Sequence, residues 1–311
     1  MNKDKIIFDA AYQPQVKTAM DTRRIMLNVI IALLPGLIFG IWQFGTNALV
    51  LALTSTGSAV FFEWAYRKLT KKSNTVGDLS AAVSGLMMAM AMPSTAPWWL
   101  PIVGTFFAIV VVKQLYGGLG KNFMNPALAG RAFLIASYAG YMTTWQVPNL
   151  LKMTTDAVST ATPQAVAYAA EIDAVTMATP MTFLYSGEPM PLCMSNLWYL
   201  FLGIRPGCLG EISALCLLIG GIYLMIRKII SWRIPVSFIG TVCLLNLIFG
   251  HEGYTNFEWM MYNLFAGSLF LGAFFMATDY VTSPVTLPGQ LLYGFGCGCI
   301  TVLIRYFGSF P

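Results

Sequence analysis

The sequence predicts an all-α polytopic membrane protein with about nine or ten transmembrane helices. Two observations carry this prediction. Hydrophobic residues make up 57% of the chain and charged residues only 10%, whereas a soluble domain carries about 25% charged residues. The apolar residues also occur in blocks that approach the roughly 20 residues that a helix needs to cross a bilayer. Both observations exclude a soluble globular domain.

Nine apolar blocks are candidate membrane spans. They lie at 25–42, 47–66, 79–95, 98–113, 124–142, 212–227, 234–250, 259–277 and 289–307. The block at 79–95 is short, rich in Met and small residues, and ends near a proline, which is typical of a broken or tilted helix. A tenth block at 190–204 is shorter than a comfortable span, so the residues leave open whether it crosses.

The positive charges indicate orientation rather than a nucleic-acid partner. The net charge of +5 comes from Lys and Arg in short segments beside the apolar blocks, as the positive-inside bias predicts. The basic residues of 1–24 and 67–72 are therefore expected in the cytoplasm, and the more acidic segment 143–189 outside. If 190–204 does not cross, the basic cluster at 227–233 is cytoplasmic and the C-terminus is outside, which is the favoured arrangement. If it does cross, the cluster is misplaced and the C-terminus is inside.

This orientation divides the chain into four parts. Residues 1–24 are expected to form a cytoplasmic N-terminal segment, and 25–142 a first membrane half of five helices. Residues 143–211 form an external loop region, and 212–311 a second membrane half. No signal peptide precedes the first block, so the first helix itself is expected to direct insertion.

A repeated pattern suggests that the two halves are related. Gly-Asp-Leu-Ser-Ala at 77–81 opens one block, and Gly-Glu-Ile-Ser-Ala at 210–214 opens another, 133 residues later. With the orientation above, the two copies begin on opposite sides, which is the arrangement of an inverted repeat. The alternative is a chance similarity between two helix starts rich in small residues.

The segment 156–163, Asp-Ala-Val-Ser-Thr-Ala-Thr-Pro, is the most specific motif of the external region. It combines one acid, Asp156, with three hydroxyls, of Ser159, Thr160 and Thr162. From its residues alone, it is a flexible linker or a helix cap built from small side chains.

The pattern Asp-x-x-Ser/Thr-x-Ala-Thr resembles the flavinylation signature of the RnfD/NqrB family, which serves Rnf complexes and the sodium-pumping NADH:quinone reductase. In that signature a flavin transferase joins the last threonine to FMN through a phosphoester. The matching position is Thr162, which follows Ala161. Thr160 stands where the signature usually has Gly or Ser, so it is a second candidate hydroxyl. Attachment through the phosphate leaves the isoalloxazine ring free to accept electrons.

The segment 117–127 contains three glycines and two amides, Asn122 and Asn125, at the start of a predicted helix. Such residues allow close backbone approach to a ligand, but they also form a tight turn with an Asn cap. Its Gly-x-Asn-x-x-Asn-Pro-Ala run resembles the same family. Arg131 follows inside an otherwise apolar helix, and a charge at membrane depth usually faces a cavity or a partner.

The segment 276–284 resembles the family again, with Tyr280 where the family usually has Pro. Its Asp279 and Thr282 could form an exposed helix cap or an unwound segment that binds a cation or a second flavin. Asp279, Arg131 and Glu63 are the candidate charges for an ion path. Each of them could instead be a side chain at a helix end that reaches toward the interface.

The resemblance implies a urea-transporter-like fold of two inverted halves in the inner membrane, with a covalent FMN near the outer face. It further implies the other membrane and peripheral subunits of an Rnf complex as partners, which couple ferredoxin:NAD electron transfer to Na⁺ or H⁺ movement. Close relatives also hold a non-covalent riboflavin. No catalytic acid–base residue is expected, because the flavin carries the chemistry. No metal site is expected either, because the spacing of Cys297 and Cys299 does not suit a cluster.

Two other functions fit the same membrane fold. One is a passive channel for a small neutral solute such as urea, and the other is a structural scaffold for redox partners. Neither function requires a flavin-acceptor threonine in an exposed loop, so the motif at 156–163 favours the redox function.

Overall fold

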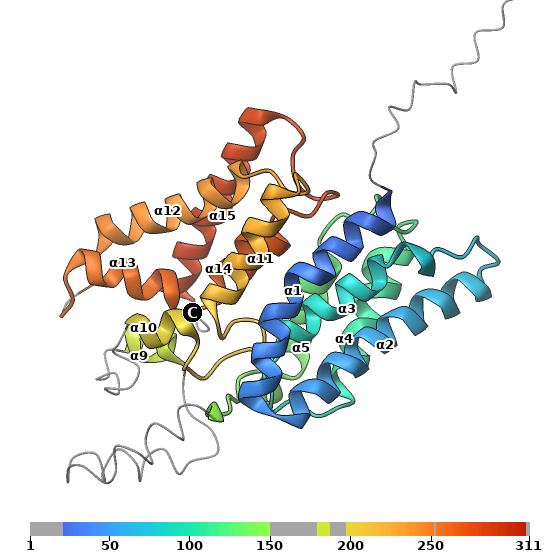
Figure 1. The fold of residues 1–311 in the computed structure, drawn as a ribbon, viewed down its shortest axis with the longest axis horizontal. Helices are drawn as coiled ribbons and strands as arrows, with labels where there is room; N and C mark the ends of the chain where they lie inside the picture. The colour runs from blue at the N-terminus through green and yellow to red at the C-terminus, as the bar shows by residue number, and fades with distance from the viewer. Residues whose placement is uncertain (1–20, 150–178, 187–196, 252, 309–311) are drawn as a thin grey trace, which may run out of the picture.

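The computed structural model describes residues 21–149, 179–186, 197–251 and 253–308, and these residues form helices joined by turns. Figure 1 shows the helices as two groups side by side, one from each end of the chain. The first group consists of α1 (Thr22–Phe44), α2 (Thr46–Leu69), the single turn η1 (Val76–Asp78), α3 (Ser80–Met90), α4 (Leu100–Phe106), the π-helix η2 (Phe107–Gln114), α5 (Pro126–Ser137) and α6 (Ala139–Met142).

The second group follows two short helices, α9 (Pro180–Ser186) and α10 (Leu197–Leu202). It consists of α11 (Ala214–Ile226), α12 (Arg233–Phe249), α13 (Asn256–Phe265), α14 (Leu269–Leu271), the π-helix η3 (Gly272–Met276) and α15 (Leu287–Phe307). Every one of the nine predicted blocks contains helix. Of the tenth block, residues 197–204 are described, and they contain α10, a helix of 6 residues.

Three helices, α1, α2 and α15, are long and apolar enough to cross a bilayer. A fourth span results if α13 and the α14–η3 helix, which meet at a bend of 64°, count as one. The other apolar helices of the described chain (α3, α4 with η2, α5, α11 and α12) have 10–17 residues, fewer than the roughly 20 of a full crossing. The number of nine or ten spans therefore stays a prediction.

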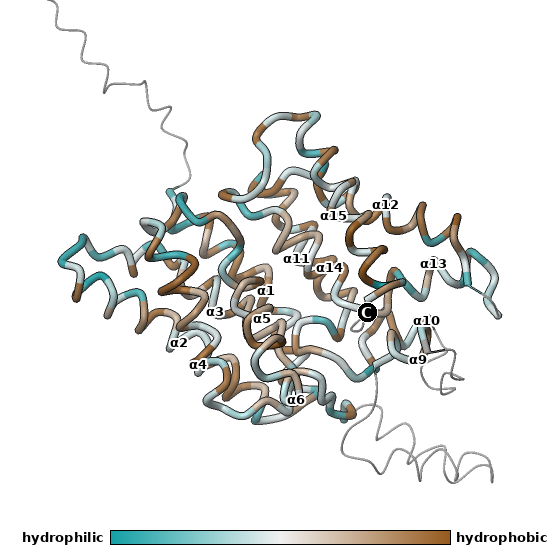
Figure 2. The backbone as a smooth tube through the Cα atoms, turned by 180° about the vertical axis from the view of Figure 1, so that it is seen from behind, coloured by the Kyte–Doolittle hydropathy of each residue, from teal (hydrophilic) through white to brown (hydrophobic). Residues whose placement is uncertain are grey.

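The surface of the bundle is apolar where the helices face outward. Large side chains such as Leu53 and Leu244 are exposed within α2 and α12, away from the helix ends, as a lipid-facing surface requires. Figure 2 shows hydrophilic residues gathered at helix ends and connections, for example after α2. Where helices touch, small residues let the backbones approach: a Cβ on Gly40 would lie 2.7 Å from the carbonyl oxygen of Leu209.

Helices α1 and α11 join the two groups and run in opposite directions. Asn28, in the second turn of α1, accepts a hydrogen bond of 2.7 Å from the hydroxyl of Tyr223, near the end of α11. Farther along α1, Gly36 faces Leu217, near the start of α11. Arg23 and Arg24, in the first turn of α1, and Arg227 and Lys228, after α11, therefore lie at the same end of the molecule.

Two irregular segments meet between the groups. The chain after α3 and the chain before α11 are joined by backbone hydrogen bonds from Leu209 N to Met92 O (3.0 Å) and from Gly210 N to Met90 O (2.7 Å). Irregular backbone is tolerated at membrane depth only where it is buried in protein or lines a cavity. These segments, with the bend between α13 and α14, therefore mark where a site can be built.

Candidate functional site

The motif at 156–163 lies outside the described residues. Its predicted site residues are Asp156, Ser159, Thr160, Ala161 and Thr162. The described chain on either side of the motif does have a position. Trp145 and Thr179 both line one cavity, which we call the second cavity.

The first cavity has a volume of about 70 Å³ and brings together three of the predicted site residues, Asn122, Asn125 and Asp279. It lies between the start of α1 and the end of α11, and the aromatic rings of Phe274 and Phe275 form part of its wall. These residues are far apart in sequence, so the fold rather than local spacing assembles the site.

The two asparagines have different roles in the first cavity. The side chain of Asn125 accepts a hydrogen bond of 3.0 Å from the backbone N–H of Ala127 and so caps α5, whose first residue is Pro126. The amide of Asn122 donates to the carbonyl of Met124 at 3.0 Å, whereas its buried Oδ1 has no hydrogen-bond partner among the described residues. Asn122 thus offers an acceptor to a ligand, and Asn125 serves mainly as the predicted cap.

Asp279 lies in the connection between η3 and α15, and it also lines the first cavity. Burial raises the pKa of its carboxyl, while hydrogen bonds from the N–H of Val281 and the hydroxyl of Thr282 lower it. The predicted pair of Asp279 and Thr282 is therefore a local turn in which the hydroxyl supports the carboxylate. The N-cap of the following helix, α15, is Thr286 rather than Asp279 or Thr282.

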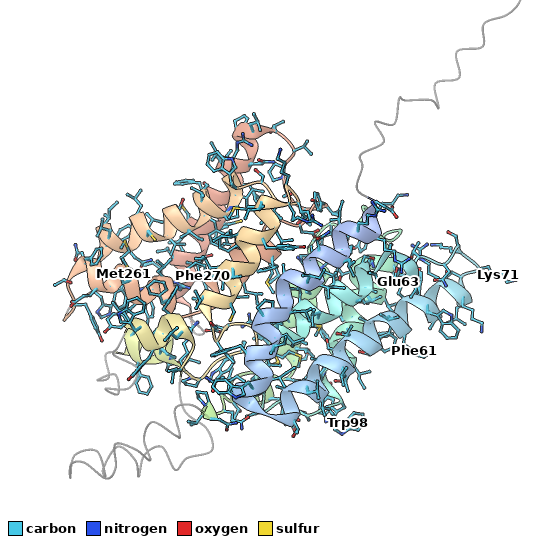
Figure 3. The ribbon with its side chains drawn as sticks, in the orientation of Figure 1. Phe61, Glu63, Lys71, Trp98, Met261 and Phe270 are labelled. Carbon is cyan, nitrogen blue, oxygen red and sulfur yellow. The ribbon has the colours of Figure 1, made fainter. Side chains whose placement is uncertain are left out.

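Glu63 belongs to a network that we call the paired cluster, which consists of Glu63, Thr75, Ser80, Lys113 and Gln114. Figure 3 labels Glu63 on α2, toward the same end as Lys71. Glu63 Oε2 accepts from Lys113 Nζ at 2.9 Å, and both residues are 1% exposed. Glu63 Oε1 accepts from Thr75 at 2.7 Å and from Gln114 at 3.0 Å, and Lys113 also donates to Ser80 at 2.6 Å. Glu63 is thus a buried ion-pair partner and does not reach toward the interface.

The second cavity lies at the opposite end of α11, beside Glu211, and has a volume of about 300 Å³. Arg131 lines it, as the prediction of a cavity-facing charge requires, and so does Arg305 near the end of α15. Arg131 is therefore separated from Asn122, Asn125 and Asp279. The predicted residues divide between two cavities.

Three arginines and one acid lie at or beside this second cavity, and we call them the arginine cluster: Arg131, Arg205, Arg305 and Glu211. Arg205 is 1% exposed and donates to the carbonyls of Glu211 (2.6 Å) and Gly267 (3.1 Å). Arg305 donates to the carbonyl of Asn263 at 2.6 Å. The arginines thus satisfy carbonyls that the bend between α13 and α14 and the loop before α11 leave without helical partners.

Lys113, Arg205 and Arg305 are buried charges that the sequence reasoning missed. Arg305 is an isolated charge in an otherwise apolar block, so the rule that selected Arg131 could have selected it too. Lys113 lies at the end of its block, where its charge alone predicts a place at the cytoplasmic surface. It is buried because α2 brings Glu63 against η2.

The chain is similar to known proteins over nearly its whole length. Residues 10–311 match the model of the NQR2, RnfD, RnfE family. The chain is 45% identical, over 96% of its length and 85% of the relative, to the D subunit of the Na⁺-translocating ferredoxin:NAD⁺ oxidoreductase complex from Acetobacterium woodii.

A second relative is the D subunit of the proton-translocating ferredoxin:NAD⁺ oxidoreductase complex of Clostridium ljungdahlii, which is 38% identical over 99% of this chain and 89% of the relative. A third, the D subunit of an ion-translocating oxidoreductase complex from Rhodobacter capsulatus, is 38% identical over 94% of this chain and 84% of the relative. Together with the spanning helices, these matches show a multi-pass membrane protein. The chain belongs to the NQR2, RnfD, RnfE family.

Proposed function

We propose that this chain is the flavin-carrying RnfD component of an Rnf-type complex. The complex transfers electrons between ferredoxin and NAD and couples this transfer to ion translocation. Its partners are the other membrane and peripheral subunits of that complex. The relatives from Acetobacterium woodii and Clostridium ljungdahlii are D subunits of such complexes. The observation that carries the flavin role is the hydroxyl-rich motif at 156–163, within a chain that matches the family from residue 10 to residue 311.

In this proposal a flavin transferase joins FMN to Thr162 through a phosphoester. Trp145 and Thr179, which are described residues on either side of the segment that carries Thr162, line the second cavity. The phosphate tether leaves the isoalloxazine ring free to receive and pass on electrons, so the chain needs no acid–base residue for this step.

The first cavity is a candidate site for a second, non-covalent flavin such as riboflavin. The free acceptor of Asn122 and the rings of Phe274 and Phe275 suit a flat, apolar molecule with hydrogen-bond donors at its edge. A volume of about 70 Å³ is far below the roughly 300–1,000 Å³ of ligand pockets. The aromatic side chains must therefore move for a flavin ring to enter.

The coupling ion is Na⁺ or H⁺, and similarity does not choose between them. The relative from Acetobacterium woodii is named for Na⁺, and the relative from Clostridium ljungdahlii is named for protons. The buried Glu63 and the half-buried Arg131 and Asp279 remain the candidates for the ion path.

We place the N-terminus in the cytoplasm of a cell whose inner membrane holds the chain, and the flavin-bearing segment outside. The antiparallel packing of α1 and α11 supports this arrangement, because α11 must then begin outside. In that case 190–204 does not cross.

We also propose that the inverted repeat has a spacing of 187 residues rather than the 133 suggested by the two small-residue motifs. Thr46 and Arg233 begin α2 and α12, and Leu100 and Leu287 begin α4 and α15; both pairs are 187 residues apart. In this register α3 corresponds to α14 with η3, and α1 to the antiparallel α11. This register supports the proposed urea-transporter-like arrangement of two inverted halves.

Flavin fluorescence on a denaturing gel tests the flavin role. The full chain, expressed with its transferase, is expected to give a fluorescent band that Thr162→Ala abolishes and Thr160→Ala leaves in place. A wild-type chain with no fluorescence would contradict the redox role and favour the channel or the scaffold. Fluorescence that persists in Thr162→Ala and disappears in Thr160→Ala would move the attachment to Thr160.

A further inference from the structure

The arginine cluster carries more positive charge than the described residues balance. Its three guanidinium groups face a single carboxylate, that of Glu211, which lies 3.9 Å from Arg205 Nη1. The other acids of the described chain are placed elsewhere: Asp21, Glu63, Asp78, Glu258 and Asp279. Glu63 is paired with Lys113, and Asp279 lines the first cavity. Two positive charges around the second cavity therefore lack a carboxylate from this part of the chain.

The burial of these charges makes the imbalance costly. Arg205 is 1% exposed and Arg305 is 7% exposed, so water screens neither of them well. Buried charges are normally paired, because removing an ion from water costs several kcal/mol that only a counter-charge and hydrogen bonds offset. The carbonyls that accept from Arg205 and Arg305 supply hydrogen bonds but no negative charge.

Donor groups in the cluster are also left without acceptors. Arg131 Nε and Arg205 Nη1 are buried and have no hydrogen-bond partner among the described residues. Arg131 makes one weak contact, from Nη2 to the sulfur of Cys208 at 3.7 Å. Unsatisfied buried donors are rare in folded proteins and indicate an unseen partner.

The second cavity supplies room for that partner. Arg131 and Arg305 reach it from different helices, α5 and α15. Its volume of about 300 Å³ exceeds the roughly 30 Å³ share of one water molecule by enough to hold a tetrahedral anion with several waters. Guanidinium groups bind phosphate through paired N–H donors, which makes arginine the preferred residue for phosphate esters.

We propose that the second cavity is a binding site for a phosphate group, held by Arg131 and Arg305, with Arg205 adding positive charge from behind. The phosphodiester between FMN and Thr162 is the source that the chain itself would supply, and this assignment of the source rests on the proposed flavin attachment. The described residues Trp145 and Thr179, on either side of the segment that carries Thr162, line this same cavity. The single negative charge of the phosphodiester would balance one of the two surplus positive charges, and the site would fix one end of the flavin tether.

A double-mutant cycle between Thr162→Ala, which removes the flavin, and Arg131→Gln tests the source of the phosphate. Arg131 suits the test because, among the described residues, its loss breaks only the contact to Cys208. Thermal unfolding of the full chain in detergent is measured for the four proteins. Thr162→Ala is expected to lower Tm by about 3 °C in the wild-type background and by less than about 1 °C in the Arg131→Gln background. Arg131→Lys, which keeps the charge, should retain about half of the coupling.

The matched control is Arg24→Gln, which removes the same charge from an exposed position, just before the residues of α1 that line the first cavity. In that background the effect of Thr162→Ala should be unchanged. If the effects of Thr162→Ala and Arg131→Gln simply add, the flavin phosphodiester is not the group in the cavity.

Two further arms test the site itself on the flavin-free Thr162→Ala protein. Sodium phosphate is compared with sodium chloride at equal ionic strength, and phosphatidylglycerol with phosphatidylcholine. Phosphate is expected to raise Tm by about 2 °C or more, and Arg131→Gln should remove this rise.

A rise only with phosphatidylglycerol would keep the site and name a lipid headgroup as the source of the phosphate. No rise in either arm, together with additivity in the cycle, would overturn the proposal. A wild-type chain without flavin would contradict the proposed attachment to Thr162. The two arms would then still test whether the second cavity binds phosphate.

Discussion

The paired cluster lies beside the first cavity, which Ser80 and Lys113 line, and the arginine cluster lies at the second cavity. The two clusters balance their charges in opposite ways. In the paired cluster, Glu63 and Lys113 neutralise each other, and neighbouring side chains take up the remaining hydrogen bonds. In the arginine cluster, three guanidinium groups share one carboxylate, and two donors have no partner among the described residues.

This difference separates two uses of charge within a membrane protein. A neutral, fully bonded pair between α2 and η2 can hold helices in register without any ligand. A cluster with surplus charge is stable only when something else completes it. We therefore expect the paired cluster to respond to mutation alone, and the arginine cluster to respond to mutation and to what is bound.

The largest effect is expected for Lys113→Met, which leaves Glu63 buried without its counter-charge. Loss of one partner of a buried ion pair costs about 3–5 kcal/mol. The variant should show a much lower Tm and a reduced yield of monodisperse protein in fluorescence-detected size exclusion.

Lys121→Met is the control, because Lys121 is exposed and should tolerate the change. The double variant Glu63→Leu/Lys113→Met should recover much of the lost stability, since an apolar pair of similar volume replaces the ion pair. If the double variant is as unstable as Lys113→Met alone, the pair does more than neutralise charge.

The next effect is expected for Glu211→Gln, which removes the one carboxylate of the arginine cluster. We expect a loss of about 1–3 kcal/mol, because Arg205 loses its counter-charge while its bonds to backbone carbonyls remain. The loss should be larger in flavin-free protein than in flavin-loaded protein. Equal losses in both forms, measured by thermal unfolding, would indicate that the cluster binds nothing.

A smaller effect is expected for Asn125→Ala, which removes the cap of α5. Loss of an N-cap typically costs about 1 kcal/mol, and Asn125→Asp, which keeps the accepting oxygen, should restore most of it. Thermal unfolding of the three proteins measures this difference. An Asn125→Asp variant as unstable as Asn125→Ala would show that the hydrogen bond from the Asn125 side-chain amide to the carbonyl of Met276 matters more than the cap.

The smallest effect on stability is expected for Asn122→Ala, because its Oδ1 has no partner among the described residues and only the hydrogen bond from its amide to Met124 O is lost. We expect a change in unfolding free energy below about 1 kcal/mol. If the first cavity holds a second flavin, the amount of flavin released by acid from the purified protein should nevertheless fall. Unchanged release would remove Asn122 from the proposed flavin site.

The sequence was sufficient to predict what depends on local composition. All nine apolar blocks contain helix, and α1, α2 and α15 lie within two or three residues of the blocks that predicted them. Arg131 faces a cavity, as expected for a lone charge in an apolar helix. These features follow from hydropathy and from the cost of burying charge, which act within one segment.

What depends on packing between distant segments could not be predicted. Glu63 and Lys113 are 50 residues apart, and nothing in either block indicates that the other will face it. The division of the predicted residues between two cavities has the same cause. The similar small-residue motifs at two helix starts also suggested a spacing of 133, which stays a prediction; the spacing of 187 that we propose rests on the order and starts of the helices.

The most direct test of the account is an experimental map of the flavin-loaded chain, within its complex, around the second cavity. The account predicts density for a phosphate group within hydrogen-bonding distance of Arg131 and Arg305, continuous with the side chain of Thr162 on one side and a flavin on the other. A flavin phosphate that lies in solvent, with a carboxylate of the same chain between the arginines, would contradict it.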